Sequence, residues 1–541
     1  MASPARPAVP VKALVIGYGV SGKAAAGWLA GQGFEVVVLE DNEGAGSSAR
    51  AAAVAAGLAL EVAPGPARAT ELGRSSSLVV PSPGVRSDHP AIAAAVAAEV
   101  EVLSEIELAW RVLDQVRRHG WPGTASRPGH DDQPPTHPSV ERQRALPGPK
   151  LVAITGTNGK TTVTELVAAM LRCSGRSAVA AGNVGYPLLE AASHLVPGQA
   201  TVLVAEVSSF QLEFTQQFRP DVSGWLNFAP NHLDWHPDLD HYAKAKAKIW
   251  ARQGAGGIAV VNADDPVVRS AAAASMPAGV DMVTFGSSSP APPDGGAPRD
   301  RGEANRERPN RERPNPERPN PDWPNPDWLV LKDGIKGPRG FYLAAADLPR
   351  ALPHDLTNTA AALAVALAAG ATDEGCREAA RRTPVPPHRV QLVAEKDGIS
   401  WYDDSKATTP AAVLAGVGGL SSVVLIAGGR NKGLDLSELA KAVPPVRAVV
   451  AVGESAGEVA EAFAGRVPVR RAESMEAAVD AAASLAVRGD AVVLSPGCAS
   501  FDWYSSYVER GENFSALVME KLHLELYGAQ PAATPVEVSR Q

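Results

Sequence analysis

The chain has 541 residues, of which 45% are hydrophobic and 20% charged, a composition typical of a globular protein. Its formal net charge of −8 argues against a general binder of nucleic acid or of membrane surfaces. The three cysteines, Cys173, Cys376 and Cys498, are too few and too scattered for a disulfide framework. No apolar run reaches the roughly 20 residues of a membrane span, and the first ten residues lack the apolar core of a signal peptide. We therefore expect a cytoplasmic protein.

The length of the chain predicts about three domains rather than one core. Strand patterns alternate with helix patterns throughout, which indicates α/β domains with mainly parallel sheets. We place a Rossmann-like domain at residues 1–115, a phosphate-loop domain at 116–384 and a second Rossmann-like domain at 385–541. The stiff segment Pro384–Pro387 between the last two is expected to act as a hinge.

Two polar, proline-rich interruptions divide this pattern, at residues 120–149 and at about 287–327. The second contains NRERP twice, followed by NPERP and NPDWP. Proline at this density prevents both a sheet ladder and a helix. We predict a linker in the first interruption and a disordered loop in the second, with a partner-docking segment as the alternative for the second.

A glycine-rich turn follows the first predicted strand, Val11–Ile16. Gly17–Gly22 (GYGVSG) fits G-x-G-x-x-G, and Glu40 ends the next predicted strand. This pattern alone is typical of a dinucleotide site and supports the rival hypothesis of an NAD-dependent oxidoreductase. The same turn can also bind another diphosphate.

A second glycine-rich segment, Thr155–Thr162 (TGTNGKTT), lies between a predicted strand and a predicted helix. In such a loop the backbone N–H groups and the helix N-terminus bind phosphates. Lys160 is expected to neutralise charge on the β- and γ-phosphates, and the Thr161 hydroxyl to reach Mg²⁺. The sequence therefore predicts ATP binding at Gly156, Thr157, Asn158, Gly159, Lys160, Thr161 and Thr162.

Acidic and imidazole groups follow in the same domain. Glu206 lies at the end of the predicted strand Thr201–Val207, which suits a Mg²⁺ ligand beside a phosphate loop. His232 comes soon after, and by itself it could equally be a structural histidine or a ligand.

The segment His241–Trp250 (HYAKAKAKIW) places one lysine apart from two others. Helical spacing puts Lys244 and Lys248 on one solvated face and Lys246 on another. Burial should lower the pKa of the Lys246 amine. A neutral amine can take up CO₂ and become a carbamate, which binds metal. The expected neighbours of Lys246 are Tyr242, Ile249 and Trp250.

The TGTNGKTT segment resembles that of the Mur ligases and of the related folylpolyglutamate synthetases, which join an amine to a carboxylate through an acyl phosphate. Asp404–Thr408 (DSKAT) and Ser495–Ser500 (SPGCAS) resemble further Mur ligase motifs. The resemblance implies an ATP-dependent ligase of peptidoglycan precursor synthesis that adds D-glutamate to UDP-N-acetylmuramoyl-L-alanine. It further implies two Mg²⁺ sites and a carbamylated Lys246.

The resemblance also assigns roles to individual residues. Implied catalytic residues are Lys160, His232, Lys246 and Arg389, and implied metal ligands are Thr161, Glu206, His232 and Lys246. Further ATP contacts are Asn358, Arg389 and Asp404. Contacts to the UDP-substrate are Gly19, Val20, Ser21, Gly84, Asn183 and His232, and contacts to D-glutamate are Thr408, Lys432, Ser500 and Tyr507. The sequence departs from the family pattern at Asp41–Asn42, where a Thr-Arg pair is common, and at Asp355, where asparagine is usual.

Several alternatives remain open at this point. Another Mur ligase or a folylpolyglutamate synthetase would share the phosphate loop, although Gly17–Gly22 argues against the latter. An NAD oxidoreductase leaves the phosphate loop unexplained, and a nucleotide switch has no use for the third domain. We expect a monomer that binds small molecules and no nucleic acid.

Overall fold

The computed structural model describes residues 11–42, 50, 52, 53, 55–119, 148–183, 185–196, 199–287 and 326–523. Nearly all of the predicted linker and of the predicted disordered loop lies outside these residues. The chain forms three sheets in two compact units. The first unit comprises residues 1–228, 240–349 and 356–383, and the second comprises 229–239, 350–355 and 384–541. The last change of unit along the chain is at Pro384, the first residue of the predicted hinge.

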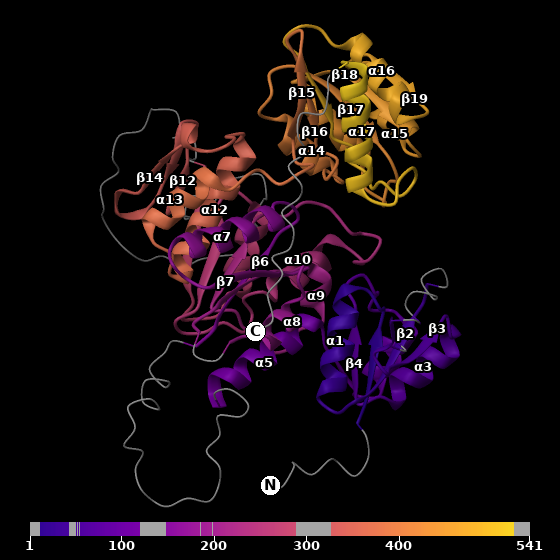
Figure 1. Ribbon diagram of the computed structural model, residues 1–541, viewed down its shortest axis with the longest axis vertical. Helices are drawn as coiled ribbons and strands as arrows, with labels where there is room; N and C mark the ends of the chain where they lie inside the picture. Colours follow the sequence, from indigo (N-terminus) through magenta and orange to yellow (C-terminus); the bar gives the residue numbers. More distant parts are fainter. Residues whose placement is uncertain are drawn as a thin grey trace, which may run out of the picture. The chain divides into compact units, whose positions relative to one another are not determined.

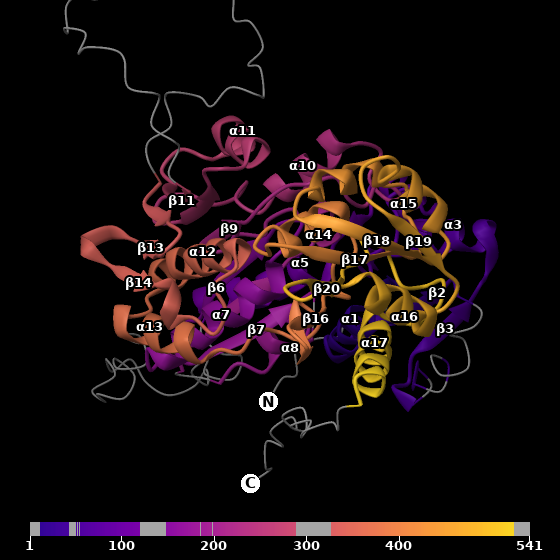
Figure 2. The ribbon, with the colours of Figure 1, turned by 90° about the horizontal axis from the view of Figure 1, so that it is seen from above.

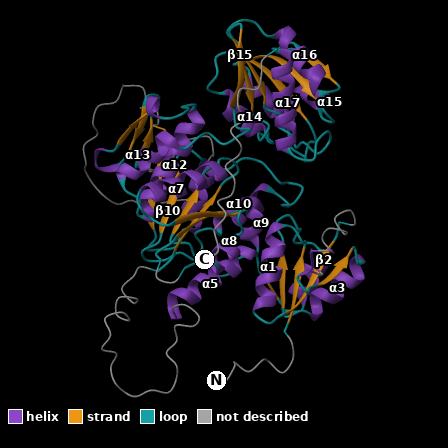
Figure 3. Cartoon of the chain, viewed as in Figure 1, coloured by secondary structure: helices purple, strands orange, loops and turns teal. Residues whose placement is uncertain are grey.

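The first sheet has five parallel strands in the order β3-β2-β1-β4-β5. Ala13 and Val15 of β1 point into one core and Leu14 and Ile16 into another, because successive side chains of a strand alternate between its faces. Helices cover both faces, with α1 and α3 on opposite sides (Figure 3). The strands are β1 (Lys12–Ile16), β2 (Glu35–Glu40), β3 (Ala59–Val62), β4 (Leu78–Pro81) and β5 (Glu101–Val102), and the helices are α1 (Val20–Gly31), α3 (Gly65–Ser75) and α4 (Pro90–Ala97).

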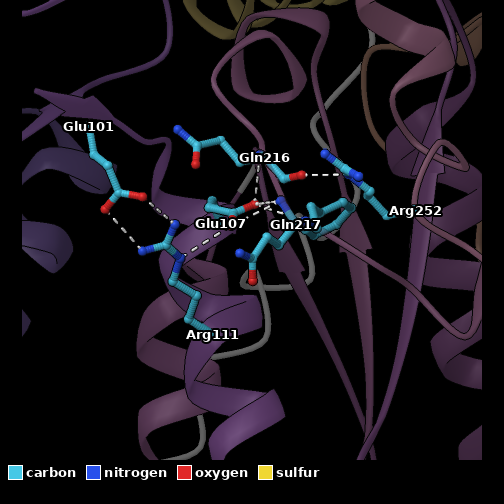
Figure 4. Close-up of polar contacts among 7 residues, drawn as sticks. Glu101, Glu107, Arg111, Gln216, Gln217 and Arg252 are labelled. Atoms are coloured by element: carbon cyan, nitrogen blue, oxygen red, sulfur yellow. Dashed lines mark hydrogen bonds and ion pairs between the residues drawn. The ribbon is translucent and has the colours of Figure 1, made fainter. Parts of the chain in front are cut away.

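Helix α5 (Glu105–His119) joins the first sheet to the second within the first unit. The buried carboxylate of Glu107 accepts hydrogen bonds from the backbone N–H groups of Gln216, Gln217 and Phe218 at 2.8–3.0 Å (Figure 4). Arg111 contacts the same carboxylate and also reaches Glu101. These donors compensate the loss of water around a buried charge.

The second sheet has nine strands in the order β14-β13-β12-β11-β10-β9-β6-β8-β7. All neighbouring pairs are parallel except β12–β13 and β13–β14, which form an antiparallel edge beside α13 (Figures 1 and 2). The strands are β6 (Lys150–Thr155), β7 (Ala178–Gly182), β8 (Val202–Glu206), β9 (Val222–Trp225), β10 (Ile258–Asn262), β11 (Asp281–Ser287), β12 (Trp328–Val330), β13 (Gly334–Lys336) and β14 (Tyr342–Ala344). The helices around it are α7 (Lys160–Cys173), α8 (Leu188–Ser193), α9 (Ser209–Glu213), α10 (Leu239–Ala247), α11 (Pro266–Ser275), α12 (Pro353–Ala369) and α13 (Asp373–Arg382), with short 3₁₀ turns at Pro338–Gly340 and Ala345–Asp347.

The two ends of the proline-rich tract lie side by side in this sheet. Strand β11 ends at Ser287 and pairs in parallel with β12, which begins at Trp328. The Asp327 carboxylate accepts from the backbone N–H and the hydroxyl of Thr284, at 2.7 and 2.9 Å. The tract is therefore an insertion between two adjacent strands.

The third sheet, in the second unit, has six strands in the order β15-β16-β20-β17-β18-β19, of which only the β15–β16 pair is antiparallel. Val423 and Leu425 face one core and Val424 and Ile426 the other. The strands are β15 (Gln391–Lys396), β16 (Ile399–Asp403), β17 (Val423–Gly428), β18 (Val446–Val452), β19 (Val469–Ala472) and β20 (Ala491–Leu494). The helices are α14 (Pro410–Val417), α15 (Ala456–Ala462), α16 (Met475–Leu485) and α17 (Tyr507–Lys521), with a 3₁₀ turn at Leu436–Ala442.

The predicted α/β fold with mainly parallel sheets is confirmed. The alanine-rich helix α4 has one buried face, which includes Ala91, Ile92 and Ala95. Among the helices of the described ranges, none is long and apolar enough to cross a membrane.

Candidate active site

The phosphate loop connects β6 to α7, as predicted. Lys160 folds over the loop, with Nζ 3.0 Å from the carbonyl oxygens of both Gly156 and Thr157. Gly159 has a φ of +81° and lies against the Asn358 side chain, whose Oδ1 would be 2.5 Å from any Cβ at this position. The conformation favours glycine here, and a Cβ would displace the Asn358 amide. Asn358, a predicted nucleotide contact, is thereby placed beside the loop.

Asn227 braces the same loop and was not identified from the sequence. Its Oδ1 accepts from the backbone N–H groups of Thr157 and Asn158, at 3.1 and 2.8 Å, and its Nδ2 donates to the Asn158 carbonyl. It fixes the loop shape by satisfying backbone groups that would otherwise need water.

Two other predicted site residues, Thr161 and Asn183, bond to Glu206. The Thr161 hydroxyl donates to Glu206 Oε2 at 2.8 Å, and the Asn183 amide donates to Oε1 at 3.3 Å. Strands β6, β8 and β7 are adjacent and parallel, so their carboxyl ends meet at one edge of the sheet. Glu206 is only 3% exposed, and these contacts keep its carboxylate pointed at the start of α7.

The predicted burial of Lys246 is confirmed, since it is 1% exposed and Tyr242, Ile249 and Trp250 are also buried. Its Nζ donates to the Gly156 carbonyl at 2.8 Å and lies 4.8 Å from the centre of the Tyr242 ring. Burial lowers the pKa of the Lys246 amine well below its usual value. The nearby Lys160 cation lowers it further, and Glu206 opposes the shift.

The other two lysines of the segment differ from each other. Lys244 is exposed and pairs with Asp240 at 2.6 Å, as expected of a solvated helix surface. Lys248 donates to the Glu213 carbonyl at 2.6 Å and lies 3.2 Å from the Glu213 carboxylate. The Lys248 side chain is 35% exposed, so the predicted solvated face is only partly exposed at this position.

The oxygen ligands available beside the phosphate loop suit Mg²⁺, which is usually bound by few protein groups, better than a metal whose ligands all come from the protein. Within the described residues no group of three His, Cys, Asp or Glu side chains could hold a metal ion. One carboxylate and one hydroxyl, from Glu206 and Thr161, fit a cation that keeps several waters and binds phosphate oxygens. His232 belongs to segment 229–239 of the second unit, so its place beside Glu206 stays a prediction.

The Glu40 side chain stabilises the turn after β1. The Glu40 carboxylate accepts from the backbone N–H groups of Tyr18 and Asn42, at 2.9 and 3.1 Å. This use counts against a ribose contact by Glu40, which the NAD hypothesis requires. Val20, 66% exposed, lies at the start of α1, and the predicted UDP contacts around it, Gly19 and Ser21, lie in the same turn. Gly84, with a φ of +98°, has open space beside its Cα.

The predicted ATP contact Asp404 is 6% exposed. Its Oδ2 accepts from the Ser495 hydroxyl at 2.6 Å and its Oδ1 from the Val390 N–H at 3.2 Å. Burial raises the pKa of Asp404 to about 7. These contacts show Asp404 supporting neighbouring loops of the second unit, which the sequence did not indicate.

Asp355, the departure from the family pattern, has a local partner. Arg350 Nε and Nη2 donate to the Asp355 carboxylate at 2.7 and 2.8 Å. Arg350 Nη1 in turn donates to the carbonyls of Arg389 and Val390, at 2.5 and 2.7 Å. The Asp355–Arg350 pair thus holds the backbone at Arg389, the predicted phosphate contact.

The predicted D-glutamate contacts lie on loops that follow β16, β17 and β20, and at the start of α17. These loops are linked, since Arg430 and Ala499 exchange backbone hydrogen bonds at 2.9 and 3.0 Å and the Gly497 N–H donates to the Ala407 carbonyl at 2.8 Å. Lys432 lies over the Phe501 ring, with 5.6 Å from Nζ to the ring centre. Thr408, Lys432 and Ser500 lie on these linked loops, and Tyr507 begins α17.

The second sheet with its glycine-rich loop, lysine and carboxylate defines a nucleotide-binding domain of the phosphate-loop type. Family models match three parts of the chain: "Mur ligase MurD-like, N-terminal domain" at residues 11–104, "Mur ligase middle domain" at 154–305 and "Mur ligase, glutamate ligase domain" at 388–498. The chain is 38% identical to UDP-N-acetylmuramoylalanine–D-glutamate ligase from Frankia casuarinae, covering 93% of both chains. It is 36% identical to the enzyme of that name from Thermobifida fusca, covering 93% of this chain and 96% of the relative.

The chain belongs to the Mur ligase family, whose members are ATP-dependent ligases. Solved structures agree on the fold. A pseudomurein peptide ligase type C from Methanothermus fervidus is 15% identical with a TM-score of 0.52, covering 94% of this chain and all of that one. MurF ligase from Thermotoga maritima, in complex with ADP, is also 15% identical, with a TM-score of 0.51 and coverage of 95% and 96%.

Proposed function

We propose that the protein adds D-glutamate to UDP-N-acetylmuramoyl-L-alanine with conversion of ATP to ADP and phosphate. The curated relatives that it matches over 93% of its length bear the name of this activity. The observation that carries the proposal within the structure is the joining of Thr161, Glu206 and Asn183 at the phosphate loop, with the buried Lys246 amine beside it.

The proposed reaction has two steps, formation of an acyl phosphate and formation of the amide. The L-alanine carboxylate oxygen attacks the γ-phosphorus of ATP, which forms an acyl phosphate and releases ADP. The D-glutamate amine then attacks the acyl carbon, an amide forms, and phosphate leaves with the former carboxylate oxygen and one proton from the amine is lost. Lys160 and Arg389 offset negative charge on the transferring phosphoryl group, the usual source of catalysis in such reactions.

Thr161 and Glu206 would hold Mg²⁺, and Glu206, His232 and Lys246 would lie around a second Mg²⁺. The metal supplies positive charge to the phosphate oxygens. The desolvated amine of Lys246 is suited to react with CO₂, because burial favours its neutral form. Carbamylation would convert it to an anion.

We assign the UDP-substrate to residues 1–115, ATP to 116–384 and D-glutamate to 385–541. The UDP contacts would be Gly19, Val20, Ser21, Gly84, Asn183 and His232. We propose a monomer that works in the cytoplasm.

Phosphate release tests the proposal. The purified chain is given ATP, Mg²⁺ and UDP-N-acetylmuramoyl-L-alanine, with D-glutamate, L-glutamate, L-alanine or L-lysine as the acceptor. Release that requires both the UDP-substrate and D-glutamate supports the assignment. Equal release with L-lysine or L-alanine would assign the chain to another Mur ligase activity.

A further inference from the structure

A buried arginine lies next to the loops of the second unit that carry the predicted D-glutamate contacts. Arg510, in the first turn of α17, is 3% exposed. Its Nε donates to the Ser405 hydroxyl at 2.9 Å, and its Nη2 donates to the carbonyls of Ser405 and Cys498, at 2.8 and 3.2 Å. Burial lowers the pKa of Arg510 to about 10, so the guanidinium stays charged at neutral pH.

One side of this guanidinium remains unsatisfied. Within the described part of the chain, Nη1 is buried and has no hydrogen-bond partner, and Arg510 forms no ion pair. The carboxylates that act on it by charge are Asp502 and Asp403. Asp403 is paired with His388 at 2.7 Å, and Asp502 accepts from the Glu454 N–H at 3.1 Å. Asp502 and Asp403 thus act on Arg510 without a direct ion pair, and a buried guanidinium with one amino group left unpaired is costly.

Gly429 brings the loop after β17 against the same guanidinium. A Cβ at Gly429 would lie 3.2 Å from Arg510 Nη1 and would collide with the Ala499 carbonyl. The φ of Gly429 is +135°, a conformation that other residues rarely adopt. The guanidinium therefore touches three loops: one leads from Ser405 to Thr408, one from Gly429 to Lys432, and one from Cys498 to Ser500.

We propose that Arg510 is a positioning residue for the acceptor amino acid. It fixes the positions of these three loops relative to one another. It also places a positive charge near the proposed binding site of D-glutamate, a dicarboxylate, where the low local dielectric strengthens the attraction. Because its Nη1 is covered by Gly429, it acts through these loops rather than by touching the substrate. This inference rests on the proposed function.

The test compares Arg510→Lys and Arg510→Met with the parent by steady-state kinetics. The expected result is a KM for D-glutamate raised about 10-fold or more, with KM for ATP and for the UDP-substrate changed less than about 3-fold. Lysine should fail to restore the KM because it cannot make the forked contacts of a guanidinium. The control, Arg447→Met, removes an arginine paired with Asp490 on the same sheet, and its KM for D-glutamate should match that of the parent.

The kinetic results distinguish failure of the positioning role from failure of the proposed function. An unchanged KM for D-glutamate in folded Arg510→Lys, or equal increases for all three substrates, overturns the positioning role. If Arg510→Met does not fold, Arg510→Lys decides the matter. If the parent itself shows no phosphate release that depends on D-glutamate, the proposed function has failed, and with it the inference that rests on it.

Discussion

The Thr161 hydroxyl and the Glu206 carboxylate are 2.8 Å apart, so the start of α7 and the end of β8 are joined by one hydrogen bond. Both groups are predicted Mg²⁺ ligands, and they approach each other closely enough to bind one cation between them. Glu206→Gln keeps the shape but removes the charge. We expect the half-saturating Mg²⁺ concentration to rise about 10-fold or more, measured by phosphate release and independently by calorimetric titration of Mg²⁺ with ADP. Thr161→Ser, which keeps a hydroxyl, is the control, and a Mg²⁺ requirement unchanged in Glu206→Gln would exclude Glu206 as a ligand.

Lys160→Ala should lower kcat by about 100-fold or more, because the side chain contributes charge at the phosphates. The ammonium bonds to backbone carbonyls of its own loop, so its loss should leave the fold intact. Circular dichroism and thermal unfolding check the fold, and Lys244→Ala is the matched control. Turnover near that of the parent in folded Lys160→Ala would remove the phosphate loop from the catalytic account.

Lys246→Ala should be nearly inactive, and a high concentration of acetate should restore part of the activity by filling the vacated anion site. The reason is the low pKa of its buried amine, which favours the carbamate. Lys244→Ala should behave like the parent, because its side chain is exposed. Lys248 is unsuitable as a second control, since it holds Glu213. Absence of rescue, or equal loss in Lys244→Ala, would contradict the carbamate.

Lys432→Ala and Ser500→Ala should each raise the KM for D-glutamate. The loss of a hydrogen bond to a charged group costs about 1.5–3 kcal/mol, which corresponds to about a 10- to 150-fold change. The KM for ATP should stay near that of the parent. A raised KM for ATP with an unchanged KM for D-glutamate would show that these loops bind a different ligand.

The raised pKa of Asp404 predicts that the free energy of unfolding depends on pH. Its native pKa of about 7 exceeds the usual 3.8, so the folded state keeps a proton that the unfolded state releases between those values. The carboxyl group therefore becomes less stabilising as pH rises through this window. Asp404→Asn should gain stability relative to the parent between pH 5 and pH 8, measured by urea unfolding. The exposed Asp480→Asn should show no such trend, and a pH-independent difference for Asp404→Asn would refute the shift.

Much of this architecture could be predicted from the sequence. Apolar runs such as Ala491–Leu494 coincide with β20, and helical spacing identified Lys246 as the buried lysine. The same spacing put Lys248 on the exposed face, but contacts with Glu213 leave its side chain only partly exposed.

Asn227 and Arg510 were missed for a different reason. Their partners are backbone groups far away in the sequence, at Asn158 and Ser405, and only the folded chain brings them together. Residue type and local spacing carry no signal for such contacts.

The most direct test of the proposed ligase uses UDP-N-acetylmuramoyl-L-alanine labelled with ¹⁸O in its alanine carboxylate. Mass spectrometry should find a product heavier by one D-glutamate residue, and one ¹⁸O atom in the released phosphate for each amide formed. Phosphate without ¹⁸O, or phosphate release without the glutamyl product, would contradict the account.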